Sequence, residues 1–505
     1  MKREAMGNLL RPSFALRRHL IWVTVALLAG LLIARLPLWM AFALCGGTLV
    51  VLGSWREPLV AIGAALLLGP LRAWISAELP QIPAQIGQAF FFLAAAIWLA
   101  RGLARREVRL PHPPLLWPLA GFLSVALLSL WSPADLWNGF TEWAKWGQLL
   151  VIFLLAYQRF QARDVTEHGA AIGVGLLVLV ACGQAAVGIW QFGLRGDGPE
   201  HFAIGVGRYR AYGTFEQPNP YGGFLALSGA LLAGLLLVLA AEWAQARWEG
   251  RPRSFRPWLW GGIGGALLLV GGGLLASWSR GAWLGFGAAL LVMAAALPRR
   301  GWWGLLLLLL IVGGGWGLHA TGRLPAALST RLTGFLDYTR FEDVRGAPIN
   351  DANYAVLERM AHWQAALAMW RDNFWLGLGL GCYEAAYADY ALINWPIALG
   401  HAHNFYLNLL AEVGLVGLTA YLVFLGALFF SLWRATRRLT GLQRGLALGL
   451  LGAFTHFAVH SLVDNLLVNN VQLHLGVLLA LAATAIIELE ETYEKRRELG
   501  SPLSS

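Results

Sequence analysis

Two side chains, Arg280 and His403, each stand where a long apolar run of this chain begins. A guanidinium is a planar fork that binds two phosphate oxygens at once. A neutral imidazole can take a proton from a hydroxyl near neutral pH. A cation and a titratable base at the water ends of two membrane spans are what an enzyme acting on a phosphate-bearing lipid needs. The alternative is structural: Arg280 could anchor a span between Trp278 and Trp283, and His403 could be an ordinary hydrogen-bonded interfacial residue.

A second pair of cations, Arg208 and Arg210, precedes the apolar run that starts near residue 220. Pro218 and Pro220, with nearby glycines, predict an ordered turn that leads into that run, since proline disrupts a continuous helix. Each arginine could add a cation to the one at Arg280, or could be a plain loop charge.

The surroundings of His403 also carry polar groups. Pro396 and Gly400 break any earlier helix, so His403 is expected at a helix start, where the helix dipole favours the neutral imidazole. Asn404 or Glu412 could orient the ring.

His456, His460 and Asp464 recur four apart, which predicts one helical face near the outer end of a span. They could bind a metal, pass protons, or form polar contacts inside a bundle. The sequence lacks the motifs of zinc hydrolases, P-loops and dinucleotide sites. No metal and no cofactor are therefore expected.

The composition excludes an ordinary soluble domain. The 505 residues are 58% hydrophobic and only 13% charged, and apolar runs of roughly 16 to 25 residues match the length of a membrane-spanning helix. We expect an all-α, polytopic membrane protein of about 12–14 transmembrane helices with a partly helical extracytoplasmic cap. The expected spans are 20–34, 37–53, 57–72, 85–100, 114–131, 140–158, 168–192, 220–241, 257–277, 281–297, 301–318, 405–433, 445–463 and 466–487.

Clusters of basic residues predict the orientation, because short cytoplasmic loops carry an excess of lysine and arginine. Two spans separate consecutive clusters, so a single assignment places all clusters and both termini in the cytoplasm. Because the basic residues are dispersed over short loops, the net charge of +10 does not indicate nucleic-acid binding. The clusters are Arg101/Arg105/Arg106/Arg109, Arg159/Arg163, Arg247/Arg251/Arg253/Arg256, Arg299/Arg300, Arg434/Arg437/Arg438/Arg444 and Lys495/Arg496/Arg497.

The same parity places three segments on the outer face: the loop 193–219, the corner at Ser279-Arg280, and the long segment 319–404. A loop of that last length is expected to be functional and partly ordered. Apolar residues from Val356 to Trp370 recur at spacings of three and four, which predicts an amphipathic helix that Asp351 could cap. Its apolar face could pack on the bundle or lie in the lipid interface.

The expected organisation follows from these boundaries. It comprises an N-terminal transmembrane bundle (1–192), a region with the outer-face arginines (193–318), the cap (319–404), the C-terminal transmembrane helices (405–487) and a cytoplasmic tail (488–505).

At this point the ordered motifs resemble a known family. Arg280-x-x-x-Leu284, followed by His403-Asn404, nine residues and Gly414-x-x-Gly417, is similar to the paired motifs of the O-antigen ligase and O-antigen polymerase superfamily of bacterial inner-membrane glycosyltransferases. The resemblance covers roughly residues 205–420. It also includes Arg210-x-x-Gly-Thr-Phe-x-x-Pro-Asn219, Glu358-Arg359, Trp363 and Gly377-x-Gly-x-Gly381.

The resemblance implies a function for each matching residue. Arg280 and Arg210, with Arg208, would bind the diphosphate of an undecaprenyl-diphosphate-linked glycan, and His403 would activate the acceptor hydroxyl. Asn404, Asn219 and Arg359 would support the site. The reaction would need no divalent metal and would take place on the periplasmic face of the bacterial inner membrane.

Several alternatives remain open. The acceptor could be lipid A core, as for an O-antigen ligase, a second lipid-linked glycan, as for a polymerase, or a protein. A transporter for lipid-linked sugar is a different class, but it predicts charges deep in the spans and paired broken helices. The ionisable residues here gather instead at the outer ends of the spans.

Overall fold

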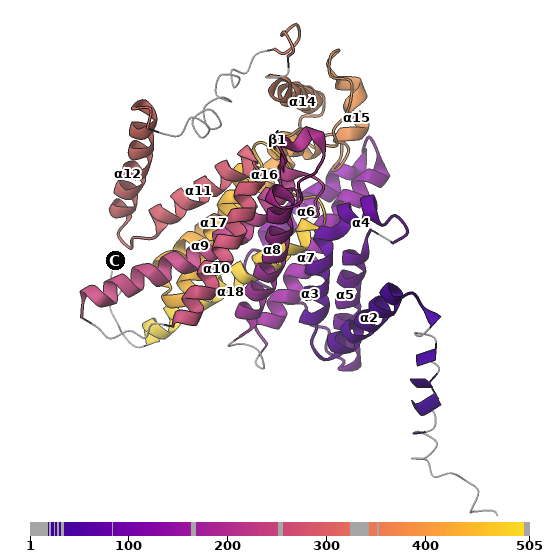
Figure 1. Cartoon of the computed structure of the whole chain (residues 1–505), viewed down its shortest axis with the longest axis vertical. Coiled ribbons are helices and arrows are strands. Elements are labelled where there is room, and N and C mark those ends of the chain that lie inside the picture. The colour runs from indigo at the N-terminus through magenta and orange to yellow at the C-terminus, as the bar shows by residue number, and fades with distance from the viewer. Residues whose placement is uncertain are drawn as a thin grey trace, which may run out of the picture. The chain divides into compact units, whose positions relative to one another are not determined.

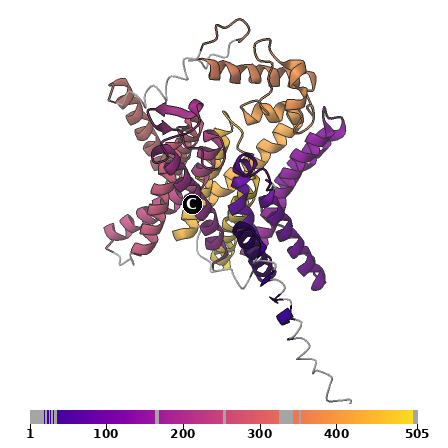
Figure 2. The same ribbon diagram turned by 45° about the vertical axis from the view of Figure 1, so that its right-hand side comes forward.

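The computed structural model describes residues 35–82, 84–162, 168–250, 256–323, 343–350 and 353–498, with isolated positions between 19 and 31. The chain divides into two compact units, residues 1–61 and residues 62–505. The smaller unit contains α2 (Leu38–Arg56) and the start of α3 (Leu59–Leu68). The larger unit holds all the candidate site residues and is almost entirely helical (Figure 1; Figure 2).

The larger unit contains most of α3 and a series of further helices. In chain order they are α4 (Arg72–Glu78), α5 (Ile86–Ala104), α6 (Leu116–Leu128), α7 (Leu136–Phe160), α8 (Gly169–Gly193), α9 (Pro218–Trp248), α10 (Pro257–Ala276), α11 (Arg280–Ala296), α12 (Gly301–Ala320), α14 (Tyr354–Asp372), α15 (Tyr383–Tyr390), α16 (Phe405–Arg438), α17 (Gly441–His460) and α18 (Val471–Glu498). Three short 3-10 helices, η1 (Gly69–Leu71), η2 (Ser129–Trp131) and η3 (Glu200–Phe202), and a two-stranded antiparallel hairpin, β1 (Ala203–Gly205) with β2 (Arg208–Tyr209), complete the described structure.

Eight of the described helical segments are long and apolar enough to cross a membrane. They are Leu59–Glu78, Ile86–Ala104, Gly169–Gly193, Pro218–Trp248, Pro257–Ala276, Gly301–Ala320, Phe405–Arg438 and Val471–Glu491. The predicted spans 37–53, 114–131, 140–158, 281–297 and 445–463 also coincide with helices. The predicted all-helical, multi-pass membrane architecture is therefore confirmed.

Some predictions fall outside the described residues. The span 20–34 lies mostly there, as do Arg163, Arg251, Arg253 and the expected cap residue Asp351.

Small residues bring the central helices of the larger unit close together. The most extensive contacts join α9 to α17, α17 to α11, α18 to α7 and α10 to α9. A Cβ atom added at Gly234 of α9 would lie 2.2 Å from the backbone nitrogen of Gly449 in α17. Helices in a membrane gain stability from such close backbone contact, because burial away from water supplies no driving force between them.

The cap consists of α14 and α15, which both views place at one end of the bundle near the start of α16 (Figure 1; Figure 2). The predicted amphipathic helix is α14, which packs in two hydrophobic clusters. Met360 and Ala361 are buried with Val344 and Trp395, and a second cluster joins Met369 and its neighbours to α15 and α16. The packing interpretation of its apolar face is the one observed.

Candidate functional site

His403 occupies an unusual backbone conformation in the loop before α16. Its φ angle is 51°, in the left-handed region that side chains other than glycine rarely adopt. Its backbone N–H donates a hydrogen bond of 3.0 Å to Nδ1 of His401. Both ring nitrogens are buried, and neither makes a hydrogen bond within the described part of the chain. The imidazole is therefore available to a group that is not part of the protein.

Aromatic and histidine side chains surround this imidazole. The ring centroid of His403 lies 5.6 Å from that of His362 and 4.5 Å from that of His401. His362, on α14, is held by a 2.9 Å hydrogen bond between its Nδ1 and the Tyr383 hydroxyl, and it stacks on Tyr387 at 4.6 Å. The cap thus forms one wall of the site.

Burial and neighbouring cations keep the imidazoles neutral. Burial, followed by the nearby His401, Arg359 and His362, lowers the pKa of His403 to about 2. Burial and His401 lower the pKa of His362 to about 4. The expected neutral form of His403 is found, but its cause differs from the prediction: His403 precedes the helix cap, and burial rather than the helix dipole has the largest effect.

Arg359 supplies a cation beside this imidazole, since its charge contributes to the lowered pKa of both His403 and His401. It projects from α14, where one terminal nitrogen donates to the Ala355 carbonyl at 2.9 Å. Its Nε is buried and has no hydrogen-bond partner among the described residues. A buried donor without a partner is costly, and an anion entering the site would satisfy it.

Arg210 is fixed at the corner that leads to Arg280. Its Nε donates to the Ser277 carbonyl at 3.1 Å, and a terminal nitrogen donates to Oδ1 of Asn219 at 3.1 Å. Asn219 therefore orients the Arg210 guanidinium. Arg208 lies on β2 and is exposed.

The turn before α9 is shorter than predicted. Pro218 begins α9, because proline is well tolerated at the first position of a helix, where no backbone donor is needed.

Two buried glutamines hold the segment next to Arg210. Gln191 accepts hydrogen bonds from the backbone N–H groups of Tyr212, at 3.1 Å, and Gly213, at 2.7 Å, and donates to the Gly213 carbonyl at 2.8 Å. Gln184 donates to the Thr214 hydroxyl at 2.9 Å. Neither glutamine was predicted from the sequence; their signal is a pair of amides seven residues apart in an otherwise apolar run.

Arg280 is exposed and is the first residue of α11. Ser279 caps that helix by accepting a hydrogen bond from the Ala282 N–H at 3.3 Å. A Cβ atom at Gly281 would lie 2.8 Å from Val463 and 3.1 Å from the ring of His460. The start of α11 is thus pressed against the turn that follows α17.

The same turn contacts the segment that carries His403. The N–H of Phe405 donates to the Ser461 carbonyl at 2.8 Å. Oδ1 of Asp464 lies 3.7 Å from Nε2 of His401. Residues 461–464 therefore join the Arg280 and His403 segments, which are more than 120 residues apart in the sequence.

The predicted helical face of His456, His460 and Asp464 is only partly correct. α17 ends at His460, so Asp464 lies beyond it and faces His401 instead. His456 is buried in the bundle, where its Nε2 lies 3.0 Å from the Gly223 carbonyl oxygen. The rings of His456 and His460 pack with their centroids 5.3 Å apart. His456 thus makes a polar contact inside the bundle.

One group of side chains has the composition of a metal site. Ligand atoms of His401, His403 and Asp464 all lie within 4.8 Å of one another. However, Nδ1 of His401 accepts a backbone N–H, so its neutral ring carries the proton on Nε2, the nitrogen that faces Asp464. This proton opposes metal binding at that nitrogen.

The two candidates for orienting the His403 ring have other functions. The Asn404 side chain caps α16 by accepting hydrogen bonds from the N–H groups of Tyr406, at 3.0 Å, and Leu407, at 3.1 Å. Glu412 is buried inside α16, with 5% of its surface exposed, and accepts a hydrogen bond from the Tyr383 N–H at 3.2 Å. The expectation that either orients the ring is not supported; both position the backbone near it.

The glycines of the motif create a break in α16. Gly414 has a φ of 64° within this helix, so the carbonyls before it are not all used by the helix. Those of Ala411 and Glu412 accept hydrogen bonds from the N–H groups of Leu378, at 3.0 Å, and Gly379, at 2.9 Å. A Cβ at Gly414 would lie 2.3 Å from the carbonyl carbon of Trp375. The break therefore connects the cap to the helix that begins beside His403.

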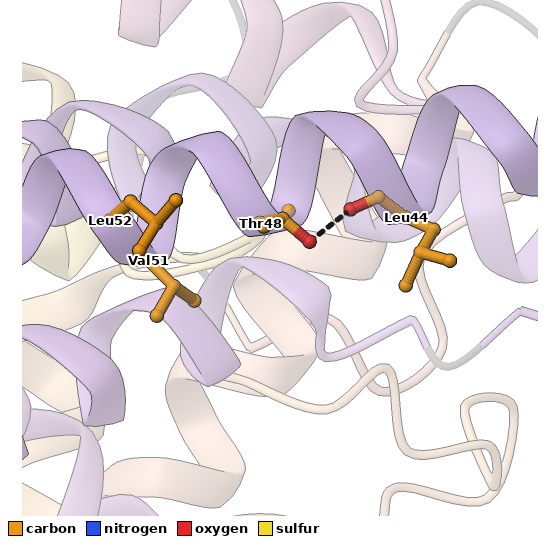
Figure 3. A pocket seen from close by; sticks show the side chains of 5 residues that line it. Leu44, Thr48, Val51 and Leu52 are labelled. Carbon is orange, nitrogen blue, oxygen red and sulfur yellow. Dashed lines mark hydrogen bonds between the residues drawn. The ribbon is translucent and has the colours of Figure 1, made fainter. Parts of the chain in front are cut away.

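The smaller unit has a hollow along one face of α2 (Figure 3). It is lined by Leu44, Gly47, Thr48, Val51 and Leu52, and the Thr48 hydroxyl donates to the Leu44 carbonyl at 2.8 Å. With no ionisable side chain, this lining offers nothing for catalysis.

Comparison with known protein families gives a match for part of the chain. Residues 265–422 match the O-antigen ligase family model, Wzy_C. This segment of the chain is similar to O-antigen ligases. No curated protein sequence matches the chain. The resemblance predicted from the sequence motifs is thereby confirmed, and members of this family carry out glycan transfer of the ligase or polymerase type on lipid-linked substrates.

The segment that matches the O-antigen ligase family contains most of the candidate site residues. It includes Arg280, Arg359, His403 and the break at Gly414, and it ends within α16. Arg210 and Asn219 lie before this segment. Arg210 nevertheless donates a hydrogen bond to the carbonyl of Ser277 within it, and Asn219 accepts a hydrogen bond from Arg210.

Proposed function

We propose that this protein transfers a glycan from undecaprenyl diphosphate to an acceptor hydroxyl, with His403 as the general base. The observation that carries the proposal is the buried His403 imidazole, whose two nitrogens have no partner among the described residues and which lies beside the Arg359 cation. A base must be neutral and within reach of the proton that it removes. The family match supplies the reaction class.

The reaction is a direct displacement at the anomeric carbon of the donor sugar. The acceptor oxygen forms a bond to this carbon as the bond to the phosphate oxygen breaks, and the departing lipid diphosphate keeps the electron pair. His403 receives the acceptor proton. A single displacement inverts the configuration of the anomeric carbon.

Arginines stabilise the negative charge that develops on the leaving diphosphate. Arg280, exposed at the start of α11, and Arg210, hydrogen-bonded to the Ser277 carbonyl, belong to the bundle. Arg359 belongs to the cap, and its buried Nε has no hydrogen-bond partner among the described groups. Arg208 would add an outer contact. A diphosphate held between bundle and cap would engage all three elements.

Donor binding also makes His403 a better base. With its pKa near 2, the His403 imidazole by itself is too weakly basic to remove a proton efficiently. An anion beside an imidazole raises its pKa, because it stabilises the protonated form. The diphosphate would therefore activate the base that it needs, and would couple proton removal to the presence of the donor.

The chemistry of the site suits several acceptors. We favour lipid A core, the acceptor of an O-antigen ligase; a polymerase that joins lipid-linked repeat units and a protein O-glycosyltransferase use the same diphosphate chemistry. We place the site on the periplasmic face of the inner membrane, with both termini in the cytoplasm. A reaction without a divalent metal agrees with the Nε2 proton of His401.

The test is glycan transfer by the purified protein from a synthetic undecaprenyl-diphosphate oligosaccharide, with a chelator present. Lipid A core, a second lipid-linked glycan and a serine-containing peptide are offered in parallel. Transfer to one acceptor with inverted configuration supports the proposal and identifies the acceptor. Donor binding without transfer to any of them would contradict it and favour a transporter.

A further inference from the structure

The backbone of His403 needs a partner to hold it. A left-handed conformation is unfavourable for a residue with a Cβ atom, and it persists only where the surroundings impose it. The φ of 51° points the side chain away from the direction that an ordinary extended residue would give it. The position of this imidazole therefore depends on whatever holds the His403 backbone.

His401 provides that hold. Its Nδ1 accepts the His403 N–H at 3.0 Å, closing a local turn across two residues. Asparagine and aspartate side chains close the same kind of turn through a carbonyl oxygen. An imidazole nitrogen accepts only when it carries no proton, so the neutral His401 ring must keep its proton on Nε2.

Asp464 lies close to that nitrogen. Its Oδ1 is 3.7 Å from Nε2 of His401, longer than a hydrogen bond but within the range of an electrostatic contact, and the Asp464 side chain is only 9% exposed. The same oxygen is fixed by a 2.8 Å hydrogen bond from the Asn465 N–H. Carboxylates often set the tautomer of a histidine in this way.

We propose that His401 and Asp464 form a positioning pair for His403: Asp464 holds the His401 proton on Nε2, which leaves Nδ1 to accept the His403 N–H and so fixes the base in its left-handed conformation. Its catalytic consequence rests on the proposed function of His403. The pair itself touches neither reacting atom, so both members are positioning residues.

The obvious competitor is a metal held by His401, His403 and Asp464, whose ligand atoms lie within 4.8 Å of one another. A metal on Nε2 of His401 would require the ring proton to move to Nδ1. There it would face the His403 N–H, and the bond that holds the backbone would be lost. A metal and the positioning pair therefore exclude each other, which makes them distinguishable.

The test compares Asp464 variants in two backgrounds. In the otherwise wild-type protein, Asp464→Ala should lower kcat by about ten- to a hundredfold. The kcat of Asp464→Asn should lie between those of the wild type and Asp464→Ala, because the amide dipole attracts the Nε2 proton more weakly than the carboxylate does. Glu384→Gln is the matched control, since Glu384 also acts electrostatically on His401 but has no ion pair with it in the described structure. It should change kcat less than twofold.

The second background is His401→Asn. The asparagine amide oxygen can accept a hydrogen bond from the His403 N–H, and unlike an imidazole it needs no particular tautomer to do so. It should recover part of the activity that His401→Ala loses. In this background Asp464→Ala and Asp464→Asn should have no further effect, since there is no tautomer left to hold. Equal losses from the Asp464 variants in both backgrounds, or a His401→Asn protein as inactive as His401→Ala, would overturn the proposal.

A readout without activity separates the pair from the proposed function. In protein labelled with 15N-histidine and placed in lipid bilayers, the nitrogen shifts of His401, assigned by their loss in His401→Asn, should report a protonated Nε2. Asp464→Ala should shift them toward a mixture of tautomers. Unchanged shifts, or a metal that co-purifies with the wild type and is lost in Asp464→Ala, would overturn the pair even if transfer is observed.

Discussion

Arg210 donates a 3.1 Å hydrogen bond to the backbone carbonyl of Ser277, three residues before Arg280. A cation contributed by the loop before α9 is thus tied to the corner that carries the cation of α11. Asn219, the second residue of α9, accepts a further hydrogen bond from the same guanidinium. The two arginines of the sequence motifs therefore belong to one rigid corner.

Arg280→Lys tests whether that corner binds phosphate oxygens. An ammonium keeps the charge and the interfacial anchoring but loses the two-pronged geometry, so kcat/KM should fall at least about tenfold. Arg323→Lys is the matched control, since Arg323 is an exposed arginine that follows α12. Unchanged turnover in Arg280→Lys would mean that Arg280 is only an interfacial anchor.

Arg359→Gln tests the cation of the cap. It removes a charge that lowers the pKa of His403, and it removes a donor for the diphosphate, so donor affinity should fall by about tenfold or more. Donor affinity is measured with a fluorescent lipid diphosphate. Arg371→Gln, an exposed arginine on the same helix, is the control. Equal affinities for the two variants would remove Arg359 from the binding site.

The lowered pKa of His403 predicts a pH dependence of stability. Its folded pKa of about 2 lies below the ordinary value of 6.5. The unfolded chain therefore binds the proton first, and stability is lost as pH falls below about 6.5, by up to about 1.4 kcal/mol per pH unit. His362 acts in the same direction, with a folded pKa of about 4. His403→Gln should therefore lose less stability than the wild type between pH 6.5 and 5, as measured by thermal unfolding. Parallel losses in the two proteins would contradict the lowered pKa.

Gly414→Ala tests the break in α16. A Cβ there would lie 2.3 Å from the Trp375 carbonyl carbon, on a residue with a φ of 64°. We expect a loss of about 2–4 kcal/mol in stability, measured as a lower Tm in detergent. Gly426→Ala lies in the same helix with no atom near the added methyl group and should be neutral. A Gly414→Ala protein as stable as the wild type would show that the break adapts.

Hydropathy and motif order predicted much of this structure. Apolar runs located the helices from α2 onward, and the three- and four-residue spacing from Val356 to Trp370 predicted α14. Contacts between distant segments could not be predicted. Asp464 sits four residues after His460, which favours a shared helical face, but α17 ends at His460 and the carboxylate turns toward His401. Only packing of the 461–464 turn against α11 and α16 determines that outcome.

The same limit applies to His403. Its position before Asn404 predicted a neutral imidazole, but the dominant cause, burial under α14 and α15, depends on tertiary structure. The glycines 377, 379 and 381 predicted a turn, and all three have positive φ angles. Nothing local indicated that this turn pairs with the carbonyls released at Gly414.

The most direct test of the central claim is transfer by His403→Ala from a synthetic undecaprenyl-diphosphate oligosaccharide, with donor binding measured on the same preparation. His201→Ala, an exposed histidine of η3, is the control. We predict that His403→Ala binds the donor as the wild type does but transfers at least about a hundredfold more slowly, while His201→Ala transfers normally. Wild-type transfer rates in His403→Ala would contradict the assignment of His403 as the general base.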